Sequence, residues 1–516
     1  MKRFFLLYLL HVSIISIQAQ PTIEWQKTFG GSLYDEGTSV KQTSDGGYII
    51  AGNTFSSDGD IFGHRGGWDV WVLKTDQSGT IQWKKVYGGT GNDVVEHIQK
   101  TTDGGYFIVG YSESNNFDVS GNHGDFDGWV LKLDSSGNIE WQNSIGGSGW
   151  DEFWAGQQTT DGGYIVAGRS ASNDGDATLN HGQLDSWVVK LSSEGEIEWQ
   201  KSFGGSKDDI GYALIQTKDG GYLLASETAS NDGDVSGLHG NTDIWLAKLL
   251  VNGEIEWQKA LGGNSGDTPS DIVQNEDGTF IVLGFVGSST GDISVYYGWL
   301  DFWLVKVDQT GEIVWEKTLG GSGPDWARKV LPSNDGGYIV AGTTHSEDFD
   351  VVGNDGGEDF WIVKVNSVGE LVWQKTLGGT KQEAAFGLSS SFDGGFILTG
   401  YAYSTNGDLT GLPNQGNEDL WVIKLAPETS SISKEPGKLN SLEIFPNPAS
   451  TEIVVKAPTQ EQNVTVVIHD LSGNLLLQRS ITNGNNLNIE HFPAGFYLIE
   501  AETEQGVKYI GKLEKI

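Results

Sequence analysis

The chain has 516 residues, of which 69 are acidic and 32 are basic, for a formal net charge of −37. A surface this acidic repels nucleic acids and anionic membranes, so neither is an expected partner. The chain has no cysteine, which excludes disulfides, thiol nucleophiles and thiolate metal sites.

The first residues have the pattern of a secretory signal peptide. Lys2 and Arg3 precede an apolar run, and a cleavage site is expected after Ala19. No later stretch of sequence is apolar enough over a sufficient length to span a bilayer. Residues 1–19 are therefore predicted to be a signal peptide that sends the chain to the periplasm.

From residue 21 to residue 427 the sequence repeats itself with a period of 58 residues. The tryptophan that opens the string WQKTFGG or a variant of it recurs at Trp25, Trp83, Trp141, Trp199, Trp257, Trp315 and Trp373. Such regular self-similarity indicates repeated supersecondary units that share one continuous core.

Each repeat contains four expected strands. In residues 141–198, tight turns follow the second and fourth strands, and a long polar loop separates the third from the fourth. Four short antiparallel strands per unit are typical of one blade of a β-propeller. We therefore predict an all-β, seven-bladed β-propeller, with a parallel β-helix as the alternative.

The phase of the repeat predicts how the ring closes. The chain enters the first repeat with a strand that has no partner, and it leaves the last repeat without the equivalent strand. Residues 22–29 are thus expected to complete the last blade, which would protect two edges that could otherwise aggregate.

The strand and tryptophan strings of each repeat resemble the tryptophan-docking motif of quinoprotein-type propellers. The resemblance implies a role in packing between blades. It implies no cofactor, because the vicinal cysteine pair of the quinone enzymes is absent.

After a polar linker at residues 428–440, residues 441–516 contain seven short strand candidates and are predicted to form a small Ig-like β-sandwich. Two strings, LEIFPNPAST and FPAGFYLIEAET, resemble the C-terminal sorting domain of the Bacteroidetes type IX secretion system. The matching positions are Pro446, Asn447, Pro448, Gly495 and Tyr497. The resemblance implies recognition by the type IX machinery and export to the outer-membrane surface or the medium.

One acidic residue follows the Gly-Gly pair of every repeat. These acids are expected at the mouth of the central channel, where each is expected to accept hydrogen bonds from the backbone N–H groups of its own turn rather than to hold a cation. They are Asp35, Asp93, Asp151, Asp209, Asp267, Asp325 and Glu383.

Two of the long loops match part of the calcium-loop template, in which alternating oxygens surround a hard cation. Weak calcium sites are predicted there, with Asx-turns and strand caps as the alternative. The candidate ligands are Asp232, Asp234, Ser236 and Asp243 in one loop, and Asn116, Asp118, Ser120 and Asp127 in the other.

Residues that depart from the repeat are the candidate ligand contacts. Aromatic side chains beside carboxylates are suited to sugars or peptides, and additional core packing is the alternative explanation. The candidates are Tyr34, Trp150, Glu152, Trp154, Tyr212, Trp326 and Arg328.

The favoured function is a secreted or surface-displayed module that binds glycan or protein through its acidic long-loop face. The first alternative is a polysaccharide hydrolase or lyase with carboxylates at the channel mouth, and the second is a structural surface protein. The near-equivalence of the repeats argues against an enzyme, because catalysis needs one asymmetric group of residues. No triad, metal-binding or phosphate-loop motif is present.

Overall fold

The computed structural model describes residues 20–516 except 429–441, 458–462, 471–474, 494 and 504–507. The chain divides into two compact units, Met1–Thr429 and Ser430–Ile516. The predicted signal peptide, and nearly all of the predicted linker, lie outside the described residues. No helix in the described part is long and apolar enough to cross a membrane.

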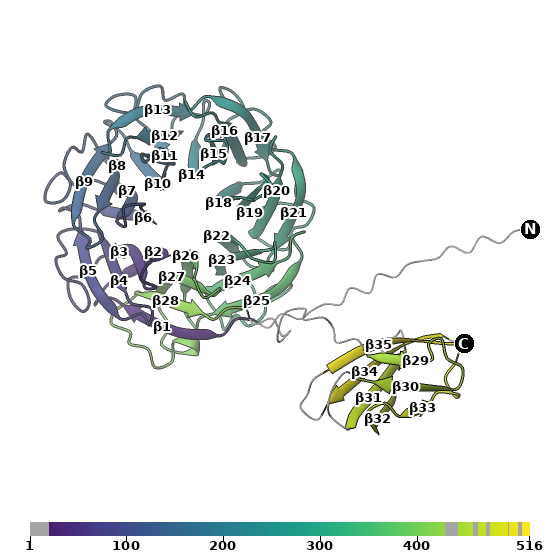
Figure 1. Cartoon of the computed structure of the whole chain (residues 1–516). Helices are drawn as coiled ribbons and strands as arrows, with labels where there is room; N and C mark the ends of the chain where they lie inside the picture. The colour runs from purple at the N-terminus through teal and green to yellow at the C-terminus, as the bar shows by residue number, and fades with distance from the viewer. Residues whose placement is uncertain (1–19, 429–441, 458–462, 471–474, 494, 504–507) are drawn as a thin grey trace, which may run out of the picture. The chain divides into compact units, whose positions relative to one another are not determined.

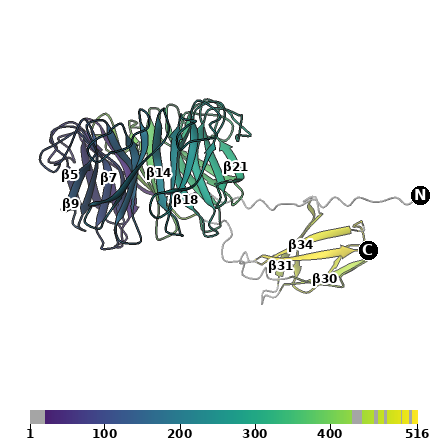
Figure 2. The same cartoon turned by 90° about the horizontal axis from the view of Figure 1, so that it is seen from above.

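The first unit is a ring of seven four-stranded antiparallel sheets around a central channel (Figure 1). Seen from above, the strands run through the thickness of a disc (Figure 2). A single turn of 3-10 helix, η1 (Gly407–Leu409), is the only helix among the described residues. This all-β, radial arrangement is that of a repeat β-propeller, as the sequence predicted.

Strands at equivalent places in the sheets share their length and burial. The strands nearest the channel are β2 (Asp35–Gln42), β6 (Asp93–Lys100), β10 (Asp151–Gln158), β14 (Asp209–Gln216), β18 (Asp267–Gln274), β22 (Asp325–Pro332) and β26 (Glu383–Ser390). The second strands are β3 (Tyr48–Thr54), β7 (Tyr106–Ser112), β11 (Tyr164–Ser170), β15 (Tyr222–Thr228), β19 (Phe280–Val286), β23 (Tyr338–Thr344) and β27 (Phe396–Ala402). The third strands are β4 (Asp69–Thr75), β8 (Asp127–Leu133), β12 (Asp185–Leu191), β16 (Asp243–Leu249), β20 (Asp301–Val307), β24 (Asp359–Val365) and β28 (Asp419–Leu425). The outer strands are β5 (Ile81–Tyr87), β9 (Ile139–Ile145), β13 (Ile197–Phe203), β17 (Ile255–Leu261), β21 (Ile313–Leu319), β25 (Leu371–Leu377) and β1 (Ile23–Phe29).

The outer strand of the last sheet comes from the other end of the repeat region. β1 pairs antiparallel with β28, with Thr28 opposite Trp421 and Phe29 opposite Leu420. The sheet order β1-β28-β27-β26 matches the order of the other six sheets. The strand pairing expected for residues 22–29 is therefore present.

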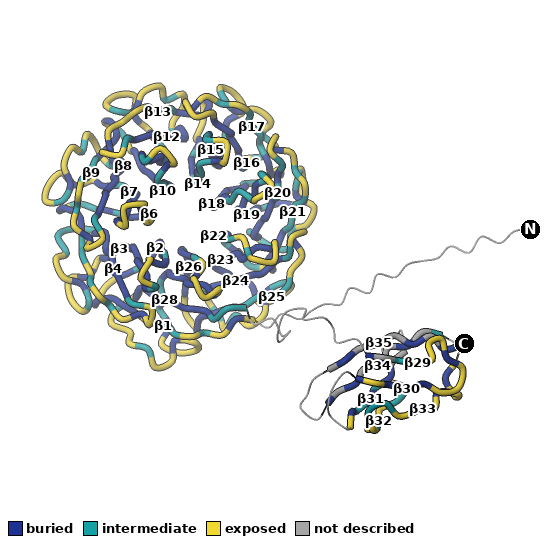
Figure 3. Tube along the Cα trace, viewed as in Figure 1, coloured by how far each residue is buried: buried dark blue, intermediate teal, exposed yellow. Residues whose placement is uncertain are grey.

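Buried side chains of the second and third strands hold neighbouring sheets together. Trp71 on β4 has no exposed surface, and it shares a buried cluster with Leu420 and Val422 of β28. Burial of one such side chain contributes about 2 kcal/mol or more. The strands are mainly buried and the connecting loops mainly exposed (Figure 3).

In six of the seven repeats the opening tryptophan covers a glycine turn of the next sheet. The ring of Trp25 lies over Gly79, which follows β4, and its indole Nε1 donates to the carbonyl oxygen of Gln77 at 3.0 Å. Gly79 has a φ of 77°, and a Cβ there would lie 2.8 Å from Trp25 Cζ3. Only glycine suits both the turn and the close approach of the indole.

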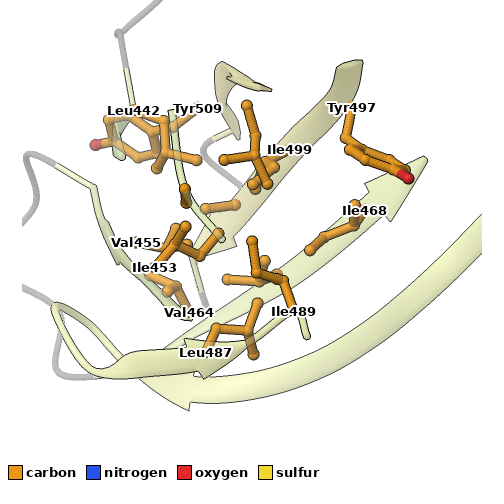
Figure 4. Packing of buried hydrophobic residues seen from close by; sticks show 14 of the residues in the cluster. Leu442, Ile453, Val455, Val464, Ile468, Leu487, Ile489, Tyr497, Ile499 and Tyr509 are labelled. Atoms are coloured by element: carbon orange, nitrogen blue, oxygen red, sulfur yellow. The ribbon is translucent and has the colours of Figure 1, made fainter. Parts of the chain in front are cut away.

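The second unit contains two sheets. Its strands are β29 (Glu443–Phe445), β30 (Glu452–Lys456), β31 (Asn463–Asp470), β32 (Leu475–Thr482), β33 (Asn486–Asn488), β34 (Gly495–Thr503) and β35 (Lys508–Lys515). The sheet orders are β29-β30-β33 and β32-β31-β34-β35. Side chains of both sheets, among them Ile453, Val455 and Ile499, form one core (Figure 4).

The predicted sorting-motif residues belong to this second unit. Pro446, Asn447 and Pro448 are exposed after β29, and Gly495 begins β34. Tyr497 is buried, and its hydroxyl donates to the carbonyl oxygen of Pro493 at 2.6 Å.

Candidate functional site in the central channel

A β-bulge interrupts every strand that lines the channel. In β10, Phe153 pairs with Gly168 and Ala155 pairs with Ala167, which leaves Trp154 without a partner between them. The same shift occurs in all seven strands, and a bulge redirects the side chain of its extra residue. The seven bulge residues are Thr38, Glu96, Trp154, Tyr212, Ser270, Arg328 and Phe386.

A glycine on the second strand accommodates this bulge. A Cβ on Gly168 would lie 1.9 Å from the carbonyl oxygen of Glu152, a distance that no side chain tolerates. Glycine also stands at the equivalent place in every other sheet except that of β14, where Ser226 replaces it. The glycine is thus part of the fold, whereas the bulge residue is free to vary.

The seven bulge residues together line one cavity of about 570 Å³ in the channel. They are seven different amino acids, and the flanking positions of the inner strands also vary between the repeats. The rest of the wall is formed by Glu36, Asn53, Trp68, Val94, Tyr111, Pro269, Phe285 and Lys329. The cavity is therefore asymmetric, although the scaffold around it is repetitive.

One buried carboxylate orients the aromatic wall of the cavity. Glu152 is 2 % exposed and accepts hydrogen bonds from the indole Nε1 atoms of Trp150 (2.6 Å) and Trp154 (3.1 Å). Arg169 Nε lies 2.8 Å from Glu152 Oε2, and its guanidinium stacks on both indoles. The Trp154 ring meets that of Tyr212 edge-on, with 4.5 Å between centroids. Glu152 therefore positions the aromatic rings, and its carboxylate is engaged within the protein.

Two ionisable bulge residues have no hydrogen bond or ion pair among the described residues. Burial, followed by repulsion from Glu36 and Glu152, raises the pKa of the Glu96 carboxyl to about 8. Glu96 is therefore protonated at neutral pH and can donate a hydrogen bond to a ligand. Arg328 stacks on the ring of Phe386 at 5.1 Å. An unpaired acid and an unpaired base thus face the same cavity.

The acids expected at the channel mouth lie elsewhere. Asp151 has no exposed surface; it accepts hydrogen bonds from the Gly147 amide (2.7 Å), from Ser170 Oγ and from Ser172 Oγ (2.7 Å). All seven acids are completely buried, and each accepts from the amide of the second glycine of its Gly-Gly pair. They accept hydrogen bonds from their own turns, as expected from the sequence, but they do not line the channel cavity.

A second buried carboxylate accompanies each of these acids. Oxygens of Asp127 and Asp151 lie 2.7 and 2.8 Å from the place where a Cβ of Gly146 would stand. The Oδ1 atom of the third-strand aspartate accepts no hydrogen bond in six sheets, those of Asp69, Asp127, Asp185, Asp301, Asp359 and Asp419. Burial raises the pKa of Asp301 and of Asp359 to about 7, and that of Asp69 and of Asp419 to about 6.

The oxygens of the predicted calcium loops are engaged in hydrogen bonds. Asp232 Oδ1 accepts from the Ser206 amide at 2.8 Å, Ser236 Oγ accepts from Gln258 at 2.5 Å, and Asp243 Oδ2 accepts from the His239 amide at 2.7 Å. The remaining candidates have similar partners: Asp234 accepts from Gly204, Asn116 from Thr90, Asp118 from Arg65, Ser120 from Gln142 and Asp127 from His123. In the described part of the chain, no three Asp, Glu, His or Cys side chains are grouped so that they could hold a metal ion.

Because the loop oxygens already have protein partners, we expect chelation to leave stability unchanged. The midpoint of thermal unfolding should be the same in 2 mM calcium and in excess EDTA. A chelator-dependent fall of several degrees, abolished in an Asp232→Asn variant, would show that this loop binds calcium after all.

The other candidate contacts lie outside the cavity. Tyr34 packs against Trp68, with ring centroids 6.5 Å apart, and Trp326 packs against His345 at 5.6 Å. Trp150 is 45 % exposed and stacks on Phe126 beside a separate groove of about 520 Å³. Of the seven candidates, only Trp154, Tyr212 and Arg328 line the cavity.

Four bulge residues escaped the sequence analysis: Thr38, Glu96, Ser270 and Phe386. Each stands three residues after the buried acid of its repeat. When the repeats are aligned, this position holds a different amino acid in every copy, but the positions on either side vary almost as much, so the sequence carries no signal that singles it out.

Comparison with known proteins confirms the sorting domain. Residues 443–514 match the model of the secretion system C-terminal sorting domain. The chain is therefore exported by type IX secretion to the cell surface or beyond it.

The chain matches two curated proteins over only part of their lengths. The chain is 30 % identical over 152 residues to an endo-acting ulvan lyase of Formosa agariphila, which covers 29 % of the chain and 28 % of the relative. It is 22 % identical over 534 residues to the regulatory protein FlaEY of Caulobacter vibrioides, which covers 91 % of the chain and 52 % of the relative. The chain thus spans about a quarter and about half of the lengths of these proteins.

Similar solved structures include a PL25 ulvan lyase bound to -[GlcA(1-4)Rha3S]-, with a TM-score of 0.45 and 10 % identity over 78 % of this chain and 96 % of that one. The WD40 domain of Neurospora crassa Pan2 has a TM-score of 0.41 and 11 % identity over 78 % of this chain and 90 % of that one.

Proposed function

We propose that this protein is a secreted seven-bladed β-propeller, closed by β1, which binds a carbohydrate in its central cavity and carries a small Ig-like sorting domain. The observation that supports the proposal is the convergence of seven different bulge side chains on one cavity. The bulge recurs in all seven inner strands whichever residue occupies it, so the fold does not dictate these side chains and a ligand can account for their chemistry.

The chemistry of the wall suits a sugar. The rings of Trp154, Tyr212 and Phe386 offer apolar faces to the C–H groups of a pyranose. The hydroxyls of Thr38 and Ser270, which donate to the carbonyl oxygens of Ala51 and Leu283, can accept hydrogen bonds from its polar edge. A cavity of about 570 Å³ is also within the usual range for small-ligand sites.

The indole of Trp154 is the most sensitive contact in this proposal. Trp154→Ala should weaken carbohydrate binding by about 30-fold or more, because roughly 2 kcal/mol of aromatic contact is lost. Titration calorimetry against oligosaccharides measures the effect.

Trp326→Ala is the matched control, since it removes a half-buried indole from an inner strand without touching the cavity. If both variants bind the sugar as the wild type does, the cavity is not the binding site.

A second candidate function is polysaccharide cleavage, favoured by the protonated state of Glu96. A carboxylic acid that keeps its proton at neutral pH can serve as a general acid. One partial relative is a polysaccharide lyase, which points to the same class of substrate. Under this hypothesis Glu96→Gln abolishes release of new sugar ends while oligosaccharide affinity stays near that of the wild type. Absence of turnover on a panel of neutral and acidic polysaccharides would leave binding as the function.

A further inference from the structure

The guanidinium of Arg328 lines the cavity and makes no ion pair with any described residue, although Glu96 and Glu36 act on it electrostatically at longer range. In a chain with 69 acidic residues and 32 basic ones, an unpaired arginine inside the channel is unexpected. Arg169, the other arginine near the cavity, is engaged by Glu152 at 2.8 Å. Arg328 instead stacks on Phe386, which fixes its plane and leaves its N–H groups available.

The repeats provide an internal control for this residue. None of the six other bulge positions carries a positive charge, so the propeller does not require arginine there. Lys329 lines the same cavity and lies 3.6 Å from Asp271, whose other oxygen accepts from the Val330 amide. The wall of β22 therefore carries one free cation, Arg328, and one that Asp271 partly neutralises.

The carboxyl groups that line the cavity or lie behind its wall oppose an anion only weakly. Glu152 is neutralised by Arg169, and Glu36 accepts a hydrogen bond from Asn53 at 2.9 Å. Glu96 is uncharged at neutral pH, because burial and the neighbouring Glu36 and Glu152 raise its pKa to about 8. β6 and β22 lie on opposite sides of the channel (Figure 1).

We propose that the carbohydrate bound in the cavity is acidic, with its carboxylate or sulfate group held by Arg328. The inference rests on the proposed function and specifies the class of ligand. Arg328 supplies paired N–H donors to the oxyanion, and the aromatic rings take the sugar that carries it. Protonated Glu96 can donate a further hydrogen bond to the ligand from the other side of the channel.

The test compares three probes of equal length on the full mature chain: an oligogalacturonate, a sulfated galacto-oligosaccharide without uronate, and a neutral cello-oligosaccharide. At pH 7 we expect at least one anionic probe to bind 10-fold or more tightly than the neutral one. The probe that does so distinguishes a carboxylate ligand from a sulfate ligand. The preference should weaken at high salt, since charge attraction is screened.

Arg328→Gln should lower the affinity for the anionic probe about 10-fold, which corresponds to about 1.4 kcal/mol, and should leave the affinity for the neutral probe unchanged. Arg328→Lys should restore part of it, because lysine keeps the charge but not the paired donors. Lys207→Gln, which removes an exposed charge from a Gly-Gly loop, is the matched control and should have no effect.

Raising the pH from 7 to 9.5 should also weaken anionic binding as Glu96 ionises. Glu36, Glu152, Arg328 and Lys329 face this group and set its titration together.

Equal affinity for neutral and anionic probes, or an Arg328→Gln variant that keeps its preference, would overturn the inference. If the neutral probe binds and Trp154→Ala abolishes its binding, the carbohydrate site stands and only its acidic specificity fails. Failure of all three probes to bind would overturn the proposed function, and this inference with it.

Discussion

Deletion of residues 22–29 should destabilise the ring by about 5 kcal/mol or more, a large part of the net stability of a typical domain. The deletion removes the pairing of β1 with β28 and exposes the surface that Trp25 and Phe29 cover. Each large apolar side chain accounts for about 2 kcal/mol, and the backbone hydrogen bonds of β28 are lost in addition. Urea titration followed by circular dichroism would measure the change.

The same deletion leaves β28 as an unprotected edge, so we also expect concentration-dependent association in size-exclusion chromatography. A synthetic peptide of residues 20–31 should bind the deleted protein and restore its midpoint. As a control, removal of the second unit, residues 430–516, should leave the unfolding of the ring unchanged. A deleted ring that stays monomeric with the wild-type midpoint would show that β1 contributes nothing to closure.

The second large effect is a loss of stability as the pH rises from 5 to 8. Buried aspartates at the sheet junctions have folded-state pKa values of about 6 to 7, above the ordinary value of 3.8. Their protonated forms are favoured by folding, so this contribution is complete below about pH 4 and is lost as the pH passes through 6 to 7. A difference of two pKa units between the folded and unfolded states of one carboxyl group corresponds to about 2.7 kcal/mol. We therefore expect the free energy of unfolding to fall by about 3 kcal/mol or more over this pH range.

Other carboxyl groups reduce the stability of the protein at low pH. Ion pairs with Lys74 and Lys132 lower the pKa of Asp45 and of Asp103 to about 2 despite partial burial. Their contribution is present above about pH 4 and is lost as the pH falls towards 2, so maximum stability is expected near pH 4.

A double variant tests whether the buried aspartates between neighbouring sheets cause this pH dependence. Asp301→Asn with Asp359→Asn keeps an acceptor for the turn amides and adds a donor that faces the neighbouring acid. Its melting temperature should therefore vary less between pH 5 and 8, and should exceed that of the wild type at pH 8. Asp45→Asn is the control and should retain the wild-type slope in this range. A wild-type melting temperature that rises with pH would contradict this account of the junctions.

Most of the architecture could be predicted because the sequence repeats with a fixed period. Tandem copies of 58 residues, each with four strand patterns, imply stacked equivalent sheets, and the phase of the copies implies that β1 joins β28. The sorting domain could also be predicted from the sequence, because each of its motifs is a contiguous stretch of residues.

The ligand cavity was only partly predictable, because it depends on register. The sequence shows Trp154, Tyr212 and Arg328 as departures from the repeat, but Trp326 and Tyr34 depart from it equally and lie elsewhere. A one-residue shift in strand pairing decides which side chain enters the channel, and no local pattern reports that shift. Similarly, an acid after a Gly-Gly pair reads as exposed, whereas three hydrogen-bond donors enclose Asp151.

The amino-acid sequence alone determined the all-β repeat, the strand that closes the ring and the export of the chain, because each depends on periodicity or on a contiguous motif. Only the tertiary structure decided which residues share the cavity and which carboxylates are buried in pairs. Both depend on contacts between residues that are distant in the sequence, such as Asp127 with Asp151 or Trp154 with Tyr212, and no local pattern reports those contacts.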